Sequence, residues 1–458
     1  MSRSVRSFLF EEHAAVLPHW FGRGLRGRTV ICFDAHLDVQ GISDGRLAHL
    51  LSCESADNVL ARMKPHHLIP DQPASATRPF GFGIEDFLFA ASRLGIIDRL
   101  IWVAPPYIPI FDMESAVQQL QQTDGVTLSD LASLTVRRDV NNSLCAVEGS
   151  LLGIDLTVCH REALPLLELP RDSLVDVDID YFVDLPSEEV AVSPASVVAD
   201  LMSLDLDFTE VTISRSVHSG YTPVQHSEIA EQLARHFAGV DACPLETQSH
   251  PVDDRENLAP EARELLRRAC EFPARGLEIG AQQIHAMECE KEALGVFDVQ
   301  RGLIEAAIGI LWGHVGELAS AVRCYHAARG VFDGHPELAL EIARLCLETG
   351  QSESARAFLL DALRDDKTSA AAHFYLGVLA IAAAHSTGSV ACMDEAAKHL
   401  QIAHDRTPAW DEVLERLVYV HTQRGDHQSA ELFHARRVAL AEAVTGHAID
   451  PVKTGSGR

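Results

Sequence analysis

The chain has 458 residues, enough for two or three domains, and a formal net charge of −28 at pH 7. A molecule this negative repels nucleic acid and anionic membranes and attracts cationic partners, so we expect no nucleic acid and no membrane among its partners. Hydrophobic residues make up 47% and charged residues 23% of the chain, as in ordinary globular proteins.

Strand-like and helix-like segments alternate through the first half of the chain. A helix is predicted over Ile84–Leu94. Short, mostly apolar runs predict strands at Arg28–Phe33, Asp98–Ala104, Leu174–Phe182 and Glu210–Ser216. This order favours an α/β fold with a parallel sheet, whose ligands usually bind beyond the carboxyl ends of the strands. We assign residues 1–245 to this domain and the polar residues 246–262 to a linker.

The second half is alanine-rich and helical over residues 263–450, before a tail at 451–458 that we expect to be disordered. Gly316 and Gly350 are 34 residues apart, the period of tetratricopeptide repeats, and each is followed five residues later by alanine, as is Gly425. A third unit fits if His385–Met393 is a loop insertion. The pattern predicts an all-α, superhelical array with a concave surface. The alternative is a helical tail without a binding groove.

The cysteines and the N-terminus bear on the compartment. Ten cysteines form no CxxC pair, and several lie in apolar segments, as in a protein of the reducing cytosol. The apolar run near the N-terminus is too short for a signal peptide. We also find no run of the roughly 18 apolar residues needed to cross a bilayer. These features predict a cytoplasmic protein.

Polar side chains follow the first strand in the segment FDAHLD. Asp34, His36 and Asp38 alternate, so on an extended segment they project to one side. Two carboxylates and an imidazole at the end of a parallel strand suit a hard divalent ion such as manganese. The competing interpretation is a loop with incidental acidic residues.

A second strand carries a similar row of carboxylates. Asp176, Asp178 and Asp180 alternate on one face of Leu174–Phe182. Buried carboxylates in a row repel one another unless cations neutralise them. Together, the two segments predict a shell for two metal ions that share bridging carboxylates. For the second segment alone, a strand with one wet face is the alternative.

These segments resemble the ureohydrolase, or arginase, superfamily over residues 5–235. The signatures of that family are a histidine in a Gly-Gly-Asp-His turn, then Asp-Ala-His-x-Asp, then Ser-x-Asp-x-Asp. FDAHLD matches the second signature, and His13 stands 21 residues before Asp34 without the glycines. Asp176 replaces the serine of the third. The chain looks like a divergent branch that includes the peptide arginases of ribosomal-peptide (RiPP) biosynthesis.

The resemblance implies a three-layer arginase-like domain with two Mn²⁺ ions per chain. One ion would be bound by His13, Asp34, Asp38 and Asp178, and the other by Asp34, His36, Asp178 and Asp180. A shift of the third signature by two residues, to Asp176 and Asp178, stays open. The implied reaction is hydrolysis of an arginine guanidinium to ornithine and urea by a metal-activated water.

Residues that read the substrate match the family less well. The segment after Asp38 lacks the Asn- and Ser-containing loop that binds free arginine in the family. This difference favours an arginine within a peptide as the substrate. His49 is a candidate proton shuttle, with helix packing as its alternative role. His218 is a second catalytic candidate. Substrate-binding candidates are Glu85, Asp86 and Tyr221, although acids in a first helical turn often serve only the helix dipole.

The leading hypothesis is a peptide arginase whose repeats dock an arginine-containing precursor peptide. Superhelical repeats commonly bind extended peptides, and a negative enzyme attracts a cationic chain. One alternative is another C–N hydrolase with the same two metals, acting on a free guanidino compound or as a deacetylase. A second is a non-catalytic repeat scaffold. The repeats could instead mediate assembly into a homo-oligomer.

Overall fold

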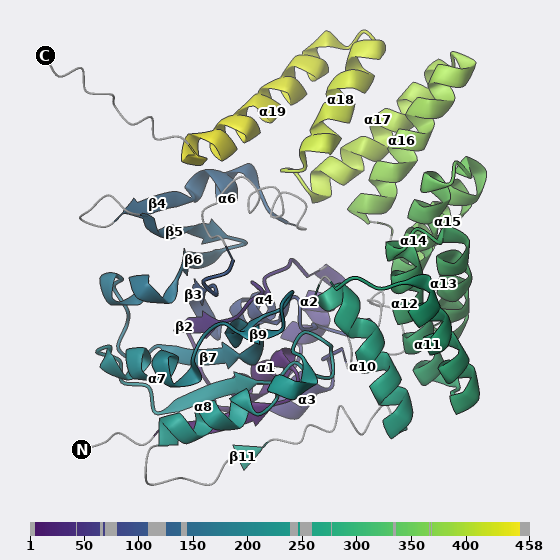
Figure 1. Cartoon of the computed structure of the whole chain (residues 1–458). Coiled ribbons are helices and arrows are strands. Elements are labelled where there is room, and N and C mark those ends of the chain that lie inside the picture. Colours follow the sequence, from purple (N-terminus) through teal and green to yellow (C-terminus); the bar gives the residue numbers. More distant parts are fainter. Residues whose placement is uncertain are drawn as a thin grey trace, which may run out of the picture. The chain divides into compact units, whose positions relative to one another are not determined.

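The computed structural model describes residues 5–42, 44–64, 67–68, 80–108, 125–138, 144–238, 246–247, 259–275, 277–332, 336–365, 367 and 369–448. The chain forms two compact units (Figure 1). The first comprises Met1–Ile108 and His160–Lys367, and the second comprises Pro109–Cys159 and Thr368–Arg458. Each is described by itself.

A parallel sheet is the centre of the first unit. Its strands lie in the order β11 (Glu246–Thr247), β1 (Arg6–Phe10), β10 (Glu210–Ser214), β7 (Leu174–Asp178), β2 (Arg28–Phe33) and β3 (Ile97–Val103). Every pair in this series is parallel. Residues Val30 to Phe33 of β2 are completely buried, as expected of a central strand covered on both faces. These six strands are parallel, as predicted, and β11 falls within the expected linker.

Short helices flank this sheet. One group contains α1 (Val16–Gly22), α2 (Asp44–Leu51), α3 (Ala56–Leu60) and α4 (Phe87–Arg93), with α4 packed against β3. The other contains α7 (Pro194–Ser203) and α8 (Ile229–Ala238), with α8 packed against β1 and β10. Helix α4 is shorter than predicted because Asp86 is its N-cap.

Two strands end earlier than predicted. β7 stops at Asp178, and Ile179–Phe182 forms a single 3₁₀ turn, η3, in which the Asp178 carboxylate accepts a hydrogen bond from the Asp180 backbone N–H. β10 stops at Ser214, and Ser216 adopts a left-handed backbone with φ 49°. A side chain–backbone hydrogen bond of this kind competes with strand pairing, which explains the end of β7. At β10, the left-handed backbone of Ser216 turns the chain out of the strand.

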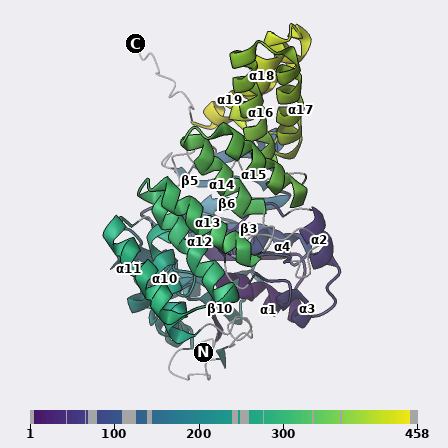
Figure 2. The same cartoon turned by 90° about the vertical axis from the view of Figure 1, so that its right-hand side faces the viewer.

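Paired helices complete the first unit (Figure 2). They are α10 (Pro260–Ala274), α11 (Ala281–Leu294), α12 (Asp298–His314), α13 (Leu318–Phe332), α14 (Pro336–Glu348) and α15 (Ser352–Asp365). Gly316 turns α12 into α13 and Gly350 turns α14 into α15, both at positive φ. Glycine adopts this conformation without steric cost. Ala321 and Ala355 are fully buried, so the period read from the sequence marks equivalent helix pairs.

The described residues of the second unit form a small antiparallel meander, a short helix and a group of longer helices. The meander runs β4 (Thr135–Arg138), β5 (Leu144–Leu151) and β6 (Ile154–Cys159), preceded by α6 (Leu128–Ser133). The helices are α16 (Ala370–Thr387), α17 (Val390–Arg406), α18 (Asp411–Gln423) and α19 (His427–Ala448). By length and hydropathy α16 could cross a membrane, unlike the expectation from sequence, but it packs against α17 with 44% of that stretch buried.

The loop insertion predicted at His385–Met393 is wrong. α16 continues to Thr387 and α17 begins at Val390, with only Gly388 (φ 67°) and Ser389 between them. The Ser386 and Thr387 hydroxyls donate to the Ala383 carbonyl, so these polar residues are satisfied inside the last helical turn. The extra residues therefore lengthen the two helices.

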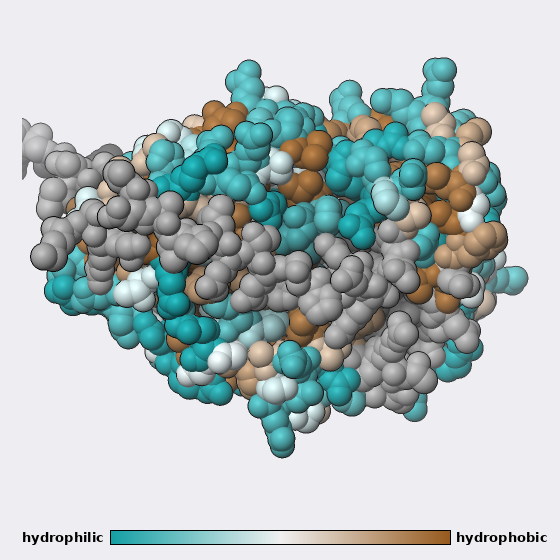
Figure 3. Space-filling view, turned by 90° about the horizontal axis from the view of Figure 1, so that it is seen from below, coloured by the Kyte–Doolittle hydropathy of each residue, from teal (hydrophilic) through white to brown (hydrophobic). Residues whose placement is uncertain are grey.

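The described surface in Figure 3 is mostly hydrophilic, with small separate apolar patches. Exposed large apolar residues such as Leu166, Val190 and Leu360 are scattered along the chain. Scattered apolar residues of this kind are normal for a soluble surface.

Candidate metal centre

The strand order gathers polar residues at one edge of the parallel sheet. β7 pairs with both β10 and β2, with Asp178 opposite Ser214 and Val177 opposite Phe33. The carboxyl ends of these strands therefore coincide, and Asp34 follows Phe33 directly beside Asp178. β1 pairs with β10 and ends at Phe10, so the turn that carries His13 begins at the same edge.

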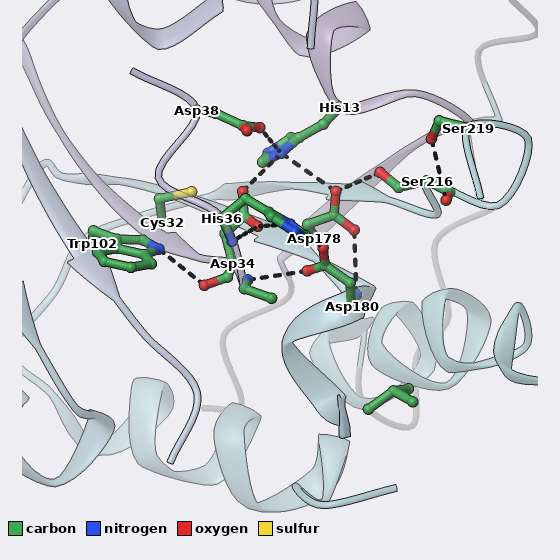
Figure 4. Close-up of polar contacts among 12 residues, drawn as sticks. His13, Cys32, Asp34, His36, Asp38, Trp102, Asp178, Asp180, Ser216 and Ser219 are labelled. Carbon is green, nitrogen blue, oxygen red and sulfur yellow. Dashed lines mark hydrogen bonds and ion pairs between the residues drawn. The ribbon is translucent and has the colours of Figure 1, made fainter. Parts of the chain in front are cut away.

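Three carboxylates surround one ring nitrogen of His13 (Figure 4). His13 Nδ1 lies 3.1 Å from Asp34 Oδ2, 3.2 Å from Asp38 Oδ2 and 3.4 Å from Asp178 Oδ2. His13 is fully buried, yet this nitrogen has no hydrogen-bond partner among the described residues, and neither has Asp34 Oδ2. Ligand atoms about 3 Å apart are what two ligands adopt when each lies roughly 2.1 Å from a shared cation.

A second group forms around His36. His36 Nδ1 lies 2.9 Å from Asp180 Oδ2 and 3.7 Å from Asp34 Oδ1. Backbone N–H groups orient the carboxylates: Ala35 donates to Asp180 and His36 donates to Asp34. Asp34 thus directs one oxygen toward each histidine, as a bridging carboxylate would. All six sequence-predicted metal ligands are together at this edge.

Asp176 has a different position from the other acids. Its Oδ2 lies 2.8 Å from His13 Nε2, the ring nitrogen that faces away from the carboxylate group. The Thr212 hydroxyl donates to Asp176 Oδ1 at 2.5 Å. It is therefore Asp180, and not Asp176, that lies beside His36. Carboxylates behind metal-binding histidines fix their tautomer and orientation. This role was not predicted from sequence; the only signal for it was an aspartate at position 176, where the resemblance has a serine.

Two strained backbone positions support the cluster. Asp38 has φ 47° and Ser216 has φ 49°, in the left-handed region that non-glycine residues rarely occupy. The Ser216 hydroxyl donates to Asp178 Oδ2 at 2.5 Å. Strain of this kind concentrates at functional sites, where the surrounding structure holds it.

The acids of the cluster compete for protons. Burial raises the pKa of Asp178 well above its usual value, and the charge of Asp180 adds to this effect. Burial and the charge of Asp34 raise the pKa of Asp38 to about 7. For Asp34, burial acts in the same direction, but the neighbouring His13 and His36 outweigh it and lower the pKa to about 2.

The two histidines respond in the opposite sense. Burial lowers the pKa of His13, but Asp176 and the other acids outweigh it and raise the pKa well above the usual value. The pKa of His36 is likewise raised, because Asp180 and Asp34 outweigh burial. Without a cation, the cluster balances its charge with protons on these groups. Divalent ions would displace those protons, which is how metal binding and pH are coupled.

The donor set fits a hard or borderline divalent ion. It consists of carboxylate oxygens and imidazole nitrogens, which suit manganese, magnesium or zinc better than soft ions. The one cysteine nearby, Cys32, directs its sulfur to Asp176, 3.7 Å away, on the far side of His13. These residues fit the two metal ions implied by the sequence resemblance.

The remaining sequence-predicted residues lie in several elements. His49 is in the last turn of α2, where its carbonyl accepts a hydrogen bond from Ser52. Asp86 accepts hydrogen bonds from Arg46, at 2.7 Å, and from the Gly83 N–H. Both Asp86 and Arg46 are buried, so this carboxylate already binds a guanidinium of the chain itself.

Glu85 and Tyr221 lie in different environments. Glu85 forms an ion pair with Lys64. Tyr221 contacts His36 edge-on, with ring centroids 4.8 Å apart, which puts it directly beside the cluster.

His218 belongs to a neighbouring group. Its backbone N–H donates to Glu11 Oε1 at 3.1 Å, and its Nδ1 lies 3.7 Å from the same oxygen. Glu11, Glu12 and His218 can bring three ligand atoms within 4.8 Å of one another. Glu11 and Glu12 directly precede His13, and the sequence analysis gave them no role.

Comparisons with known proteins concern the helical region. The tetratricopeptide repeat family matches residues 315–377. Among curated proteins, no sequence matches the chain. The family match supports a C-terminal region of tetratricopeptide-like repeats, as predicted, and it lies outside the carboxylate cluster.

Solved structures of repeat proteins are similar to the chain at low identity. The 41-end fragment of MamA from Desulfovibrio magneticus RS-1 is 14% identical, with 40% of this chain and 97% of that chain covered at a TM-score of 0.34. YrrB, titled a TPR protein with an unusual peptide-binding site, is 11% identical, with 43% and 96% covered at a TM-score of 0.31. At these TM-scores the similarities carry no further argument.

Proposed function

We propose that the chain is an arginase-like hydrolase with two manganese ions that converts arginine side chains in a peptide to ornithine and urea. The observation that carries this proposal is the pair of groups around His13 and His36, joined by Asp34. Two metal sites that share a carboxylate are the arrangement of binuclear hydrolases. The order of the ligands along the chain supports the arginase-like assignment.

Different residues of the chain would bind the two ions, orient the ligands and move a proton. His13, Asp34, Asp38 and Asp178 would hold one ion, and Asp34, His36, Asp178 and Asp180 the other. Bound there, the ions would supply a water activated for nucleophilic attack near neutral pH. Asp176 holds His13 in the tautomer that presents Nδ1, and Ser216 orients Asp178. Water adds to the guanidinium carbon, the bond from that carbon to Nε breaks, and Nε takes up a proton. His49 and His218 remain the candidates for moving that proton.

An arginine within a peptide is the proposed substrate. The segment after Asp38 lacks the residues that read a free α-amino and α-carboxylate group. A net charge of −28 attracts an arginine-bearing chain, and the repeats offer a surface for a precursor peptide. Manganese is proposed as the cofactor because oxygen and imidazole ligands suit it.

The test is incubation of the manganese-loaded protein with arginine-containing peptides. We expect release of urea and a mass loss equal to CH₂N₂ per processed arginine. Asp178→Asn should abolish both. Asp205→Asn is the control and should change neither, because the Asp205 side chain is 79% exposed. Loss of an acetyl group from an acylated amine would point to the deacetylase alternative. Absence of bound manganese would point to a scaffold.

A further inference from the structure

A pocket lies where the first repeat helices meet His67 and Leu68, all within the first unit. Its volume is about 510 Å³, within the range of sites that hold small ligands. α12, α13 and α14 form most of its wall, and they are neighbours in Figure 2. The lining residues that matter here are His67, Ile310, Gly313, Tyr325, Leu338 and Arg344.

A row of aromatic rings joins this pocket to the carboxylate cluster. The ring centroid of His67 lies 5.5 Å from that of Tyr221, which lies 4.8 Å from that of His36. The His67 ring is therefore at most about 10 Å from a proposed metal ligand, a span of about three residues of extended chain. A peptide with one residue at the metal centre can reach the pocket with its next few residues, whereas free arginine has no chain to place there.

The charged groups at the two ends of this row of rings differ. They suit a cationic side chain near the cluster and a neutral side chain in the pocket. His36, which Tyr221 contacts, lies 2.9 Å from Asp180 Oδ2 and 3.7 Å from Asp34 Oδ1, so carboxylates surround the end nearest the cluster. In the pocket, Arg344 forms ion pairs with Glu341 and Glu348, so its charge is compensated. Ile310 and Leu338 provide apolar surface beside it.

We propose that this pocket binds the residues within about three positions of the processed arginine, with an uncharged, apolar side chain in contact with Ile310 and Leu338. The proposal rests on the proposed function and deepens it: the substrate is a peptide selected by the neighbours of its arginine. The occupant is the substrate chain itself, because the His67 ring in the pocket wall lies at most about 10 Å from the His36 ring of the cluster that would act on it.

Gly313 offers a way to fill the pocket without disturbing the fold. It lies on α12, and a Cβ added there meets no atom within 4 Å. Gly313→Leu should therefore occupy the pocket, and replacing a helical glycine does not weaken the helix. Gly330→Leu is the matched control, since Gly330 is also helical, with equally open space, but lies on α13 outside the lining.

The experiment compares two substrates of the manganese-loaded protein. One is a pool of nonapeptides with a central arginine and varied flanking residues, and the other is acetyl-arginine methylamide, which is too short to reach the pocket. We expect Gly313→Leu to lower the ratio of kcat/KM for the pool to that for the small substrate at least tenfold, through KM. Gly330→Leu should keep the wild-type ratio. An unchanged ratio in Gly313→Leu would overturn the pocket assignment and leave the proposed function standing.

Binding to metal-free protein separates the two proposals. Fluorescence anisotropy of the labelled pool should show binding to wild type and Gly330→Leu, and at least tenfold weaker binding to Gly313→Leu. If no substrate releases urea but this difference in binding is seen, the pocket is supported and the proposed function fails. If the three proteins bind the pool equally, or none binds it, the pocket assignment fails.

Discussion

At the edge of the parallel sheet several ionisable side chains are buried together, whereas the buried positions of α12–α15 are mostly alanine, leucine, isoleucine and cysteine. These ionisable residues are His13, Asp34, Asp176, Asp178 and Asp180. Burying several carboxylates side by side costs free energy that only protons or cations can offset. Burying alanine and leucine between helices lowers the free energy of the fold. The first region therefore needs a balancing positive charge, whereas the second is stabilised by its own packing.

The largest effect should come from the carboxylate that the two histidine groups share. Asp34→Asn removes a negatively charged oxygen next to both the His13 group and the His36 group. We therefore expect bound manganese to fall from two ions to none, and urea release to fall by about 10³-fold or more. Asp38→Asn, which touches only the His13 group, should lose one ion. Elemental analysis of the purified variants measures this. Equal metal content in both variants would contradict a bridging role for Asp34.

The helical region should respond in stability alone. Leu359 on α15 is fully buried, and Leu359→Ala should lower the free energy of unfolding by about 2–5 kcal/mol. The next residue provides the control: Leu360 is 49% exposed, and Leu360→Ala should change that free energy by less than about 0.5 kcal/mol. Denaturant unfolding gives both values. Manganese content should match wild type in each variant, and its loss in Leu359→Ala would mean that the two regions are not separate in function.

A smaller effect is expected from the residue behind His13. Asp176→Asn keeps the size of the side chain and its contact with Thr212, but weakens the hold on His13 Nε2. Carboxylates in this position affect metal affinity by about 10–100-fold. Calorimetric titration with Mn²⁺ should show this loss for one of the two ions, with two ions still bound at saturation. Urea release at saturating metal should change much less than affinity, because the metal ligands are all present.

A pH-dependent effect on stability is expected at the wall of the pocket. Burial and the charge of Lys64 lower the pKa of His67 to about 3. The unfolded chain, with histidine near 6.5, binds a proton that the folded chain does not, so stability rises with pH between about 3 and 6.5. His67→Gln should remove this contribution and flatten the acid side of the stability profile. Thermal unfolding from pH 4 to 7 measures this profile. The same slope in the variant as in wild type would exclude His67 as a source of the pH dependence.

The two regions also differed in what could be predicted from sequence. The parallel sheet followed from apolar runs such as Arg28–Phe33, whose burial on both faces leaves a strong local signal. The repeat period followed from glycines that must turn the chain at positive φ. The loop at His385–Met393 was predicted wrongly because serine and threonine can bond to a helical carbonyl, a choice that composition does not reveal. The strand ends at Asp178 and Ser214 were missed because side chains there bond to backbone or to each other.

By itself, the sequence predicted which residues could bind metal, since Asp34, His36 and Asp38 follow a recognisable strand and Asp178 and Asp180 alternate on one face of another. Only the tertiary structure decided which histidine each aspartate lies beside. The pairing of β7 with β2 and β10 directs Asp176 behind His13 and Asp180 toward His36, although the two aspartates alternate identically along the chain. Residue types and spacings describe one segment at a time. The neighbour that each carboxylate meets depends on strand register and on the turn at Asp178, which form only when the sheet assembles.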